Sequence, residues 1–363
     1  MNIFFAIIIF CITLFLYLHI YYQLKTSNDL EIYEIENPSK EKLEEICDIR
    51  QPVLFNFINE RINHNLKLDS VIKYYSAFDI QIRDVKNNNK DEELYIPLLL
   101  KTSQTLFNND KESKYISEKN HDFLEETGLK KAYQYNDDFL RPFLVSNCKY
   151  DLLLGSNNSV SPFKYNLNYR NFFMVTQGEV TIKLAPPKSS RYLYTSKDYE
   201  NFEFSSPINP WDVQHQYKAD FDKVKCLEIK LKPGFIFYIP AYWWYSIKFN
   251  NNTSIAAFYY KSYMNNIAIL PELCMHFLQS TNVKRNSYKR VSEGQGKEPT
   301  VSQHQHNGES GSPDISLKKN EKSENNIKSN SIKSNSIKSN SIKSNNIKSN
   351  NIKSNYIVND KTN

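Results

Sequence analysis

The sequence predicts a mostly β domain, an antiparallel barrel or sandwich with flanking helices, between an N-terminal transmembrane helix and a disordered C-terminal tail. An apolar run at the N-terminus, short β-prone runs at close intervals from residue 151, and a polar repeat at the end predict this order. Aromatic residues make up 14% of the 363 residues, which is ample material for a core. The predicted divisions are an anchor at 1–24, a domain at 25–280 with its core at 151–261, and a tail at 281–363.

The apolar run Ile3–Tyr22 is long enough to cross the ~30 Å hydrocarbon layer of a bilayer as a helix. A cleaved signal peptide is the alternative, but the run is long for one and the following YYQLK offers no small-x-small cleavage site. No Lys or Arg precedes the run, whereas Lys25, Lys40 and Lys42 follow it. This asymmetry predicts a single-pass membrane protein with most of the chain on the cytoplasmic side.

The net charge of +6 comes from the tail. From Thr281 onward 15 Lys and Arg stand against 7 Asp and Glu, and the preceding residues hold the remaining 31 and 33. The folded part therefore gives no basis for specific nucleic-acid binding. In the tail IKSN recurs six times at a spacing of five, from Ile327 to Ile352, which matches neither helix nor strand. An expanded codon repeat is the first interpretation, and a basic tether for an anionic surface is the alternative.

The first half of the domain alternates helices and strands. The pattern predicts strands at Glu31–Ile35, Gln51–Phe57 and Phe78–Val85, and helices from Ser39 to Cys47, at Leu66–Tyr75 and at Phe123–Lys131. We expect the charged run Asn108–His121 to be a mobile loop. The five cysteines form no CxxC pair, which excludes a disulfide framework or zinc pattern and fits a reducing compartment.

From Asp151 short strands follow one another. They are DLLLG, then NFFMVTQG and EVTIKLAPP as a hairpin around Gln177-Gly178, and, after a long excursion at Lys188–Phe221, KCLEIKL, FIFYIP, YSIKF and SIAAFYY. Residues 265–278 return to helical spacing, which predicts a helix for core packing or a homodimer contact.

The stretch Lys232–Ile247 (KPGFIFYIPAYWWYSI) joins a Pro-Gly turn, a buried strand and an aromatic cluster, and so predicts the mouth of a barrel pocket. Packing within the barrel is the first interpretation of Trp243 and Trp244. A binding surface formed with Tyr242 is the alternative.

Four blocks in this order resemble the cupin-like JmjC hydroxylases, which depend on Fe(II) and 2-oxoglutarate. They read LLLGSNNSVSPFKYN, NYRNFFMVTQGEVTIKLAPP, LKPGFIFYIPAYWWYSI and AAFYYK. The chain is most similar to the branch with the asparaginyl hydroxylase that acts on hypoxia-inducible factor. The resemblance implies a double-stranded β-helix barrel of the cupin or jelly-roll type.

The same resemblance implies an iron site made of an HxD motif on one strand and a distal His, the two-His, one-carboxylate triad. Carried onto this chain, the HxD falls on Lys164-Tyr165-Asn166 and the distal His on Tyr245. A protonated lysine has no lone pair, asparagine lacks the charge, and tyrosine ionises only near pH ~10. We therefore expect neither a bound metal nor a cofactor; Fe(II) and 2-oxoglutarate at an atypical site are the alternative.

The 2-oxoglutarate pocket of the family is altered as well. Its carboxylate-pairing lysine corresponds to Val180, or to Thr181 or Lys183 if the register slips. A pocket threonine corresponds to Ser161. One pocket asparagine is kept as Asn171, and another corresponds to Ala257. Lys164 itself either points out of the barrel or places its ammonium where the metal would lie, paired with a buried acid or a small anion.

These residues favour a membrane-anchored pseudoenzyme, a cupin-like module that acts as a structural, protein-binding or peptide-binding domain. The alternatives are an active Fe(II)- and 2-oxoglutarate-dependent protein hydroxylase or demethylase with an atypical metal site, and a membrane or particle-coat component without a small-molecule ligand.

Overall fold

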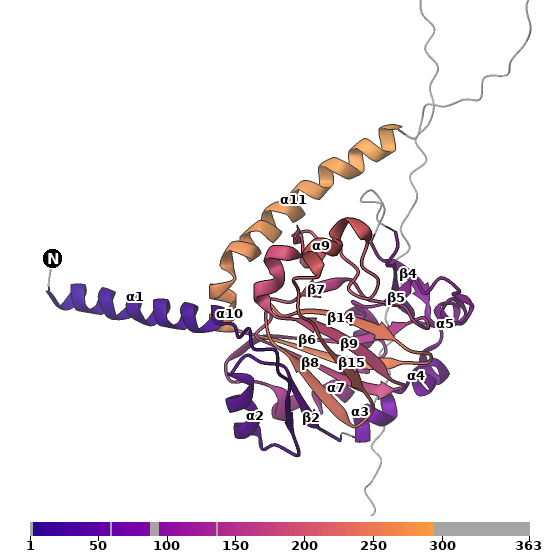
Figure 1. Cartoon of the computed structure of the whole chain (residues 1–363), viewed down its shortest axis with the longest axis horizontal. Helices are drawn as coiled ribbons and strands as arrows, with labels where there is room; N and C mark the ends of the chain where they lie inside the picture. Colours follow the sequence, from indigo (N-terminus) through magenta and orange to yellow (C-terminus); the bar gives the residue numbers. More distant parts are fainter. Residues whose placement is uncertain (1–2, 59, 88–93, 136, 294–363) are drawn as a thin grey trace, which may run out of the picture. The chain divides into compact units, whose positions relative to one another are not determined.

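The computed structural model describes residues 3–58, 60–87, 94–135 and 137–293, and they form two sheets with flanking helices (Figure 1). The nine-stranded sheet has the order β1 (Tyr33–Ile35), β2 (Val53–Asn56), β13 (Phe235–Ile239), β8 (Arg170–Gln177), β15 (Ser254–Ser262), β6 (Val145–Gly155), β5 (Tyr115–Ser117), β3 (Asp79–Asp84), β4 (Ile96–Leu99). The six-stranded sheet has the order β10 (Ser196–Asp198), β11 (Glu203–Ser206), β7 (Phe163–Tyr165), β14 (Trp244–Phe249), β9 (Val180–Ala185), β12 (Leu227–Leu231). Among the described strands, β1 and β2 pair in parallel and the other pairings are antiparallel.

Helices surround the two sheets. They are α1 (Ile3–Leu24), α2 (Lys40–Cys47), α3 (Glu60–Asn65), α4 (Leu68–Tyr75), α5 (Leu100–Asn109), α6 (His121–Glu126), α7 (Lys130–Gln134), α8 (Asp137–Leu140), α9 (Lys218–Phe221), α10 (Tyr263–Ala268) and α11 (Leu270–Glu293), with 3₁₀ turns η1 (Pro187–Tyr192) and η2 (His215–Tyr217). The predicted start of α2 is confirmed, since the Ser39 side chain accepts a hydrogen bond from the Lys42 amide as an N-cap.

One apolar core lies between the two sheets. Successive residues of a strand point to opposite faces, so Phe173 and Val175 of β8 face this core, while Phe172 and Met174 face away. The six-stranded sheet contributes Ile182 of β9, among others. Two facing, mainly antiparallel sheets with flanking helices confirm the predicted barrel of the double-stranded β-helix type.

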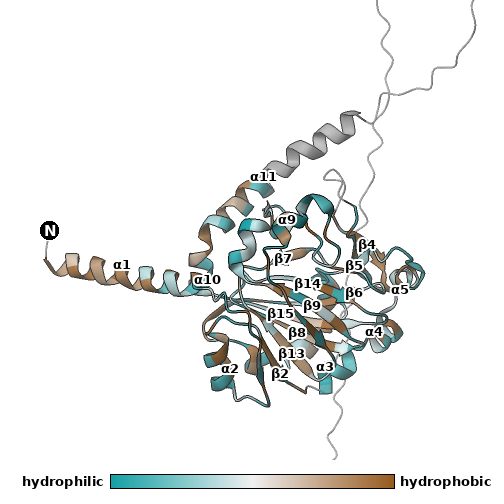
Figure 2. Ribbon diagram, viewed as in Figure 1, coloured by the Kyte–Doolittle hydropathy of each residue, from teal (hydrophilic) through white to brown (hydrophobic). Residues whose placement is uncertain are grey.

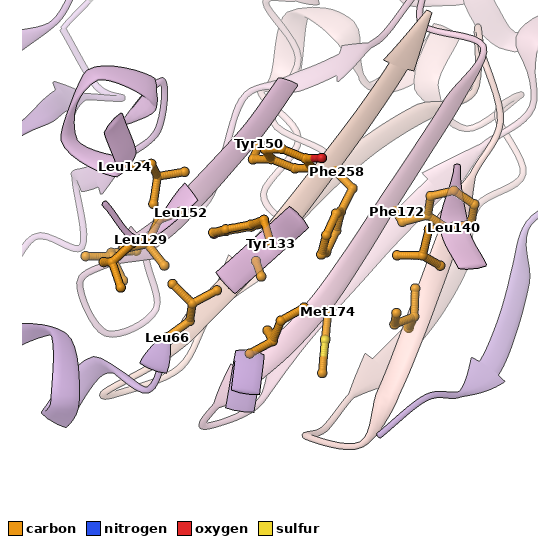
Figure 3. Packing of buried hydrophobic residues seen from close by; sticks show 14 of the residues in the cluster. Leu66, Leu124, Leu129, Tyr133, Leu140, Tyr150, Leu152, Phe172, Met174 and Phe258 are labelled. Carbon is orange, nitrogen blue, oxygen red and sulfur yellow. The ribbon is translucent and has the colours of Figure 1, made fainter. Parts of the chain in front are cut away.

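A second core covers the outer face of the nine-stranded sheet. Figure 3 shows Tyr133 of α7 packed beside Tyr150 of β6 and Phe258 of β15, with ring centroids 5.2 Å from Tyr133 in both cases. Leucines from the surrounding helices and turns, such as Leu124 and Leu140, complete it. Because both faces of this sheet are covered, its central strands are apolar throughout rather than alternating.

The predicted hairpin around Gln177-Gly178 is wrong. β8 pairs with β13 and β15, whereas β9 pairs with β14 and β12 in the other sheet. The chain crosses between sheets at Gly178, whose φ is +75°. A Cβ at this position would lie 2.7 Å from the Thr253 Oγ1, so the crossing needs glycine for both its conformation and its space. The strand propensity of the residues predicts that β8 and β9 are strands, but it does not predict the sheet to which each belongs.

Two segments expected to lack strands contain them. The charged run Asn108–His121 holds β5, which pairs with β3 and β6, so the loop prediction is wrong there. The excursion after Lys188 holds β10 and β11, which extend the six-stranded sheet. Charged and polar residues dominate both runs, so the apolar alternation that marks a strand is weak in them.

The terminal helices differ from the prediction in their bounds. The helix expected at 265–278 is two helices, since α10 ends at Ala268 and α11 begins at Leu270 and continues past the predicted domain boundary. Figure 2 shows apolar residues along most of α1. Among the described residues, α1 is the helix that is long and apolar enough to cross a membrane. The predicted IKSN tail lies outside the described residues.

Candidate functional site

The three positions predicted to replace iron ligands come together between the sheets. Lys164 lies on β7, Asn166 follows this strand, and Tyr245 lies on β14 opposite Lys164 in the strand register. The i, i+2 spacing places Lys164 and Asn166 on one side of the chain. The Asn166 Nδ2 donates a hydrogen bond to the Tyr245 hydroxyl at 3.0 Å. All three side chains therefore converge between the sheets.

The ammonium of Lys164 forms an ion pair with Glu118, the residue that follows β5. The Nζ lies 2.5 Å from the Glu118 Oε2, and the two side chains are 13% and 10% exposed. The expectation that Lys164 pairs with a buried acid is confirmed, and the alternative in which it points out of the barrel is wrong. Such a pair holds two side chains in place, because either charge alone would be costly at this depth.

Glu118 belongs to a larger network of buried charges. Arg83 of β3 lies with its Nη1 3.3 Å from Glu118 and binds both carboxylate oxygens of Glu203 at 2.7 and 3.1 Å. The Tyr95 hydroxyl donates to Glu118 at 2.8 Å. Among Lys164, Arg83, Glu118 and Glu203, two positive charges face two negative charges, so the charges of these four side chains balance.

The pKa values of Glu118, Lys164 and Tyr245 lie far from 7, so each side chain has one charge state at neutral pH. Burial alone would raise the pKa of Glu118, but the charges of Lys164 and Arg83 outweigh it and lower that pKa to about 2. Burial also opposes the charge of Lys164, yet Glu118 holds its pKa above the usual value. Burial raises the pKa of Tyr245 to about 12. At neutral pH the site thus holds an ammonium, a carboxylate and a neutral phenol.

Very little open space remains at the centre. A cavity of about 10 Å³ is lined by Ser161, Lys164, Tyr245, Tyr259 and Glu118, with apolar neighbours around them. This volume holds about one water molecule. The side chains that converge here therefore leave no room at this point for a ligand of several heavy atoms.

These residues do not fit an iron centre. The Lys164 nitrogen carries its proton and has no lone pair to offer, the Tyr245 phenol keeps its proton, and Asn166 offers only a neutral amide oxygen, so the three supply neither an imidazole nor an anionic ligand. Within the described part of the chain, no group of three or more His, Cys, Asp and Glu side chains has a metal-binding arrangement.

The residues predicted to correspond to the cosubstrate pocket divide into two groups. Ser161 lines the cavity, and its Oγ accepts a hydrogen bond from the Ile247 amide at 2.9 Å. Asn171 is buried, with its Nδ2 donating to the Ile239 carbonyl at 3.0 Å. Val180 and Ala257 are fully buried in the apolar core between the sheets and are not among the cavity-lining residues.

The aromatic cluster is part of the core. Trp243 and Trp244 are 0% exposed, with Nε1 donors bonded to the Arg50 carbonyl and the Ser190 Oγ. The alternative that placed them on a binding surface is therefore wrong for both, and the packing interpretation is confirmed. Tyr242 is half-buried and has a φ of +66°. It alone of the three keeps some surface at the barrel mouth.

The two acids and the arginine that complete the site, Glu118, Glu203 and Arg83, were not predicted from the sequence. Arg83 lies in the alternating strand FDIQIRDV on the face opposite the buried Ile80 and Ile82, where an arginine is expected to face solvent, but the structure buries it. Such an arginine requires an acid partner. The sequence pattern did not indicate a buried role for Glu118 or Glu203 either, since both lie in segments that were expected to be loops.

The low pKa of Glu118 predicts acid sensitivity. The folded protein binds fewer protons at Glu118 than the unfolded chain below pH 4.5, so the free energy of unfolding decreases as pH falls from 4.5 toward 2. Denaturant titrations across this window measure the effect. The difference in stability between the wild type and Glu118→Gln should shrink as pH falls, because protonation makes the two alike. A difference that stays constant with pH contradicts the assignment.

The Cupin-like domain family matches this chain over residues 38–265, which is more than half of its length. The match covers β2 to β15 and includes every residue of the site described above.

Proposed function

Because the chain belongs to the cupin-like domain family, whose fold it shares, we propose that it is a membrane-anchored, non-catalytic member of that family, a pseudo-hydroxylase that acts as a structural or protein-binding module. The observation that supports this proposal is the neutral network around Lys164 and Glu118. It fills the barrel centre, and its donor set does not suit iron.

The resemblance to Fe(II)- and 2-oxoglutarate-dependent hydroxylases supports the comparison of Lys164, Asn166 and Tyr245 with a metal triad. Under this comparison, the ammonium of Lys164 lies where the metal would be held. The positive charge of a cation is then kept, while the open coordination positions that oxygen chemistry requires are lost. A packed fold survives such changes because it depends on patterning rather than on site residues.

The last turn of α1 supports an uncleaved anchor. Gln23 is buried, Tyr22 forms a side-chain hydrogen bond with Asp48, and the Arg50 guanidinium lies 5.4 Å from the Tyr22 ring centroid. Removal of a signal peptide would remove these contacts with Asp48 and Arg50. The lysines after α1 support a cytoplasmic location of the domain.

Metal content and turnover test the proposal together. Purified full-length protein, loaded anaerobically with Fe(II) and desalted, should retain far less than one iron per chain. It should also release no succinate from 2-oxoglutarate above the buffer background. A cooperative thermal transition in the same sample shows that the protein is folded. Stoichiometric iron with 2-oxoglutarate-dependent succinate release would instead establish the alternative, an oxygenase with an atypical site.

A further inference from the structure

Four large apolar side chains are exposed beside the end of α1. Phe143 is 80% exposed, Leu144 57%, Tyr263 60% and Ile267 40%. The Tyr263 amide donates to the Leu144 carbonyl at 3.2 Å, which joins the 143–144 loop to the start of α10. We call these four residues the apolar collar. Their exposure to water is unfavourable by about 25 cal/mol per Å² of apolar surface.

The apolar collar adjoins the last turns of α1. A cavity of about 490 Å³ lies between them, lined by Leu18, His19 and Tyr22 from α1 and by Phe143, Leu144 and Met264, among others. α1 and α10 are also in contact. The apolar collar therefore lies beside the last two turns of α1, at the same height along the helix axis.

The length of α1 fixes where this level lies in a bilayer. Its 22 residues extend about 33 Å at 1.5 Å per residue, against a hydrocarbon layer of ~30 Å. A helix with so little excess length places Tyr22 close to the boundary between acyl chains and headgroups, and Leu18 about one turn, or ~6 Å, deeper. Tyr17, Tyr21 and Tyr22 suit that boundary, where aromatic side chains gather.

The backbone of the collar is itself held in an unfavourable conformation. Leu144 has a φ of +52°, a left-handed conformation that costs of order 1 kcal/mol or more for a residue with a branched side chain. This conformation presents an apolar side chain to the surface and not to the core. A contact outside the protein would account for both features.

We propose that the apolar collar inserts into the interfacial layer of a phospholipid bilayer, so that the domain docks on the membrane surface instead of being tethered loosely to it. The proposal rests on the membrane anchor proposed above. Of the charged residues that line the cavity, Asp48 is paired with Arg170 at 2.5 Å and Glu44 is acidic, so this surface offers no basic cluster for anionic lipid. The partner is therefore a zwitterionic bilayer surface, held by apolar contact.

Tryptophan quenching tests the docking. Full-length Phe143→Trp and Tyr263→Trp, each in phosphatidylcholine nanodiscs, should lose most of the added fluorescence when the lipid is replaced by its dibrominated form. Tyr74→Trp is the matched control, because Tyr74 is 63% exposed on α4. Its added fluorescence should not change. The wild type, with its three native tryptophans, gives the background.

The outcomes separate this proposal from the anchor. Release of the wild type from vesicles by alkaline carbonate overturns both. Retention in the membrane without quenching at positions 143 and 263 overturns the docking and leaves the anchor intact. An emission that is shifted to the blue but insensitive to brominated lipid assigns the apolar collar to a second copy of the chain and also overturns the docking. Two positions are used so that one misfolded variant does not decide the result.

Discussion

Replacing Lys164 with methionine should destabilise the protein by about 3–5 kcal/mol, the usual cost of leaving a buried charge without its partner. The Lys164 Nζ is the nearest cation to the Glu118 Oε2, at 2.5 Å, while Arg83 is 3.3 Å from the other oxygen and is already bound to Glu203. Methionine keeps much of the volume and removes the charge. Denaturant unfolding of the purified variant measures the loss.

Two further variants make the result specific to the pair. Lys164→Met combined with Glu118→Gln should recover most of the loss, because a neutral amide no longer needs the cation. Lys42→Met should change stability by less than about 1 kcal/mol, since the Lys42–Glu45 pair is 54% and 68% exposed. If Lys164→Met reduces the free energy of unfolding as little as Lys42→Met does, the buried ion pair does not stabilise the centre of the barrel.

Trp243→Ala should destabilise the protein by about 3–5 kcal/mol as well, through the cavity that it leaves in the core. The indole is 0% exposed and packs between the sheets, and its Nε1 donates to the Arg50 carbonyl at 3.2 Å. The substitution thus also leaves a buried acceptor without a partner. Thermal and denaturant unfolding measure the change.

Trp211→Ala is the matched control for this substitution. Trp211 is only partly buried and lies outside the apolar cores, with its Nε1 bonded to the Ser246 Oγ at 3.0 Å. We expect a clearly smaller loss of stability. If Trp243→Ala leaves stability unchanged and instead abolishes binding of a partner, the result contradicts the packing role of Trp243 and supports a binding role.

Much of the fold follows from local patterns. The strands around FFMV and FIFYI are apolar and β-prone enough to be placed from the sequence, and Ser39 marks the start of α2 as a capping residue does. The choice of sheet at Gly178 does not follow from such patterns. It depends on pairing between strands far apart in the chain, which local propensity does not contain.

For this protein, the sequence by itself determined the barrel, the apolar helix at its start and the unusual residues at Lys164, Asn166 and Tyr245. The tertiary structure decided what those residues do. It brought Arg83 of β3 and Glu118, the residue after β5, to the site, and it buried Trp243 and Trp244. The local sequence can show that a charged residue stands at an unusual position. Its partner, however, depends on which distant segments fold against it.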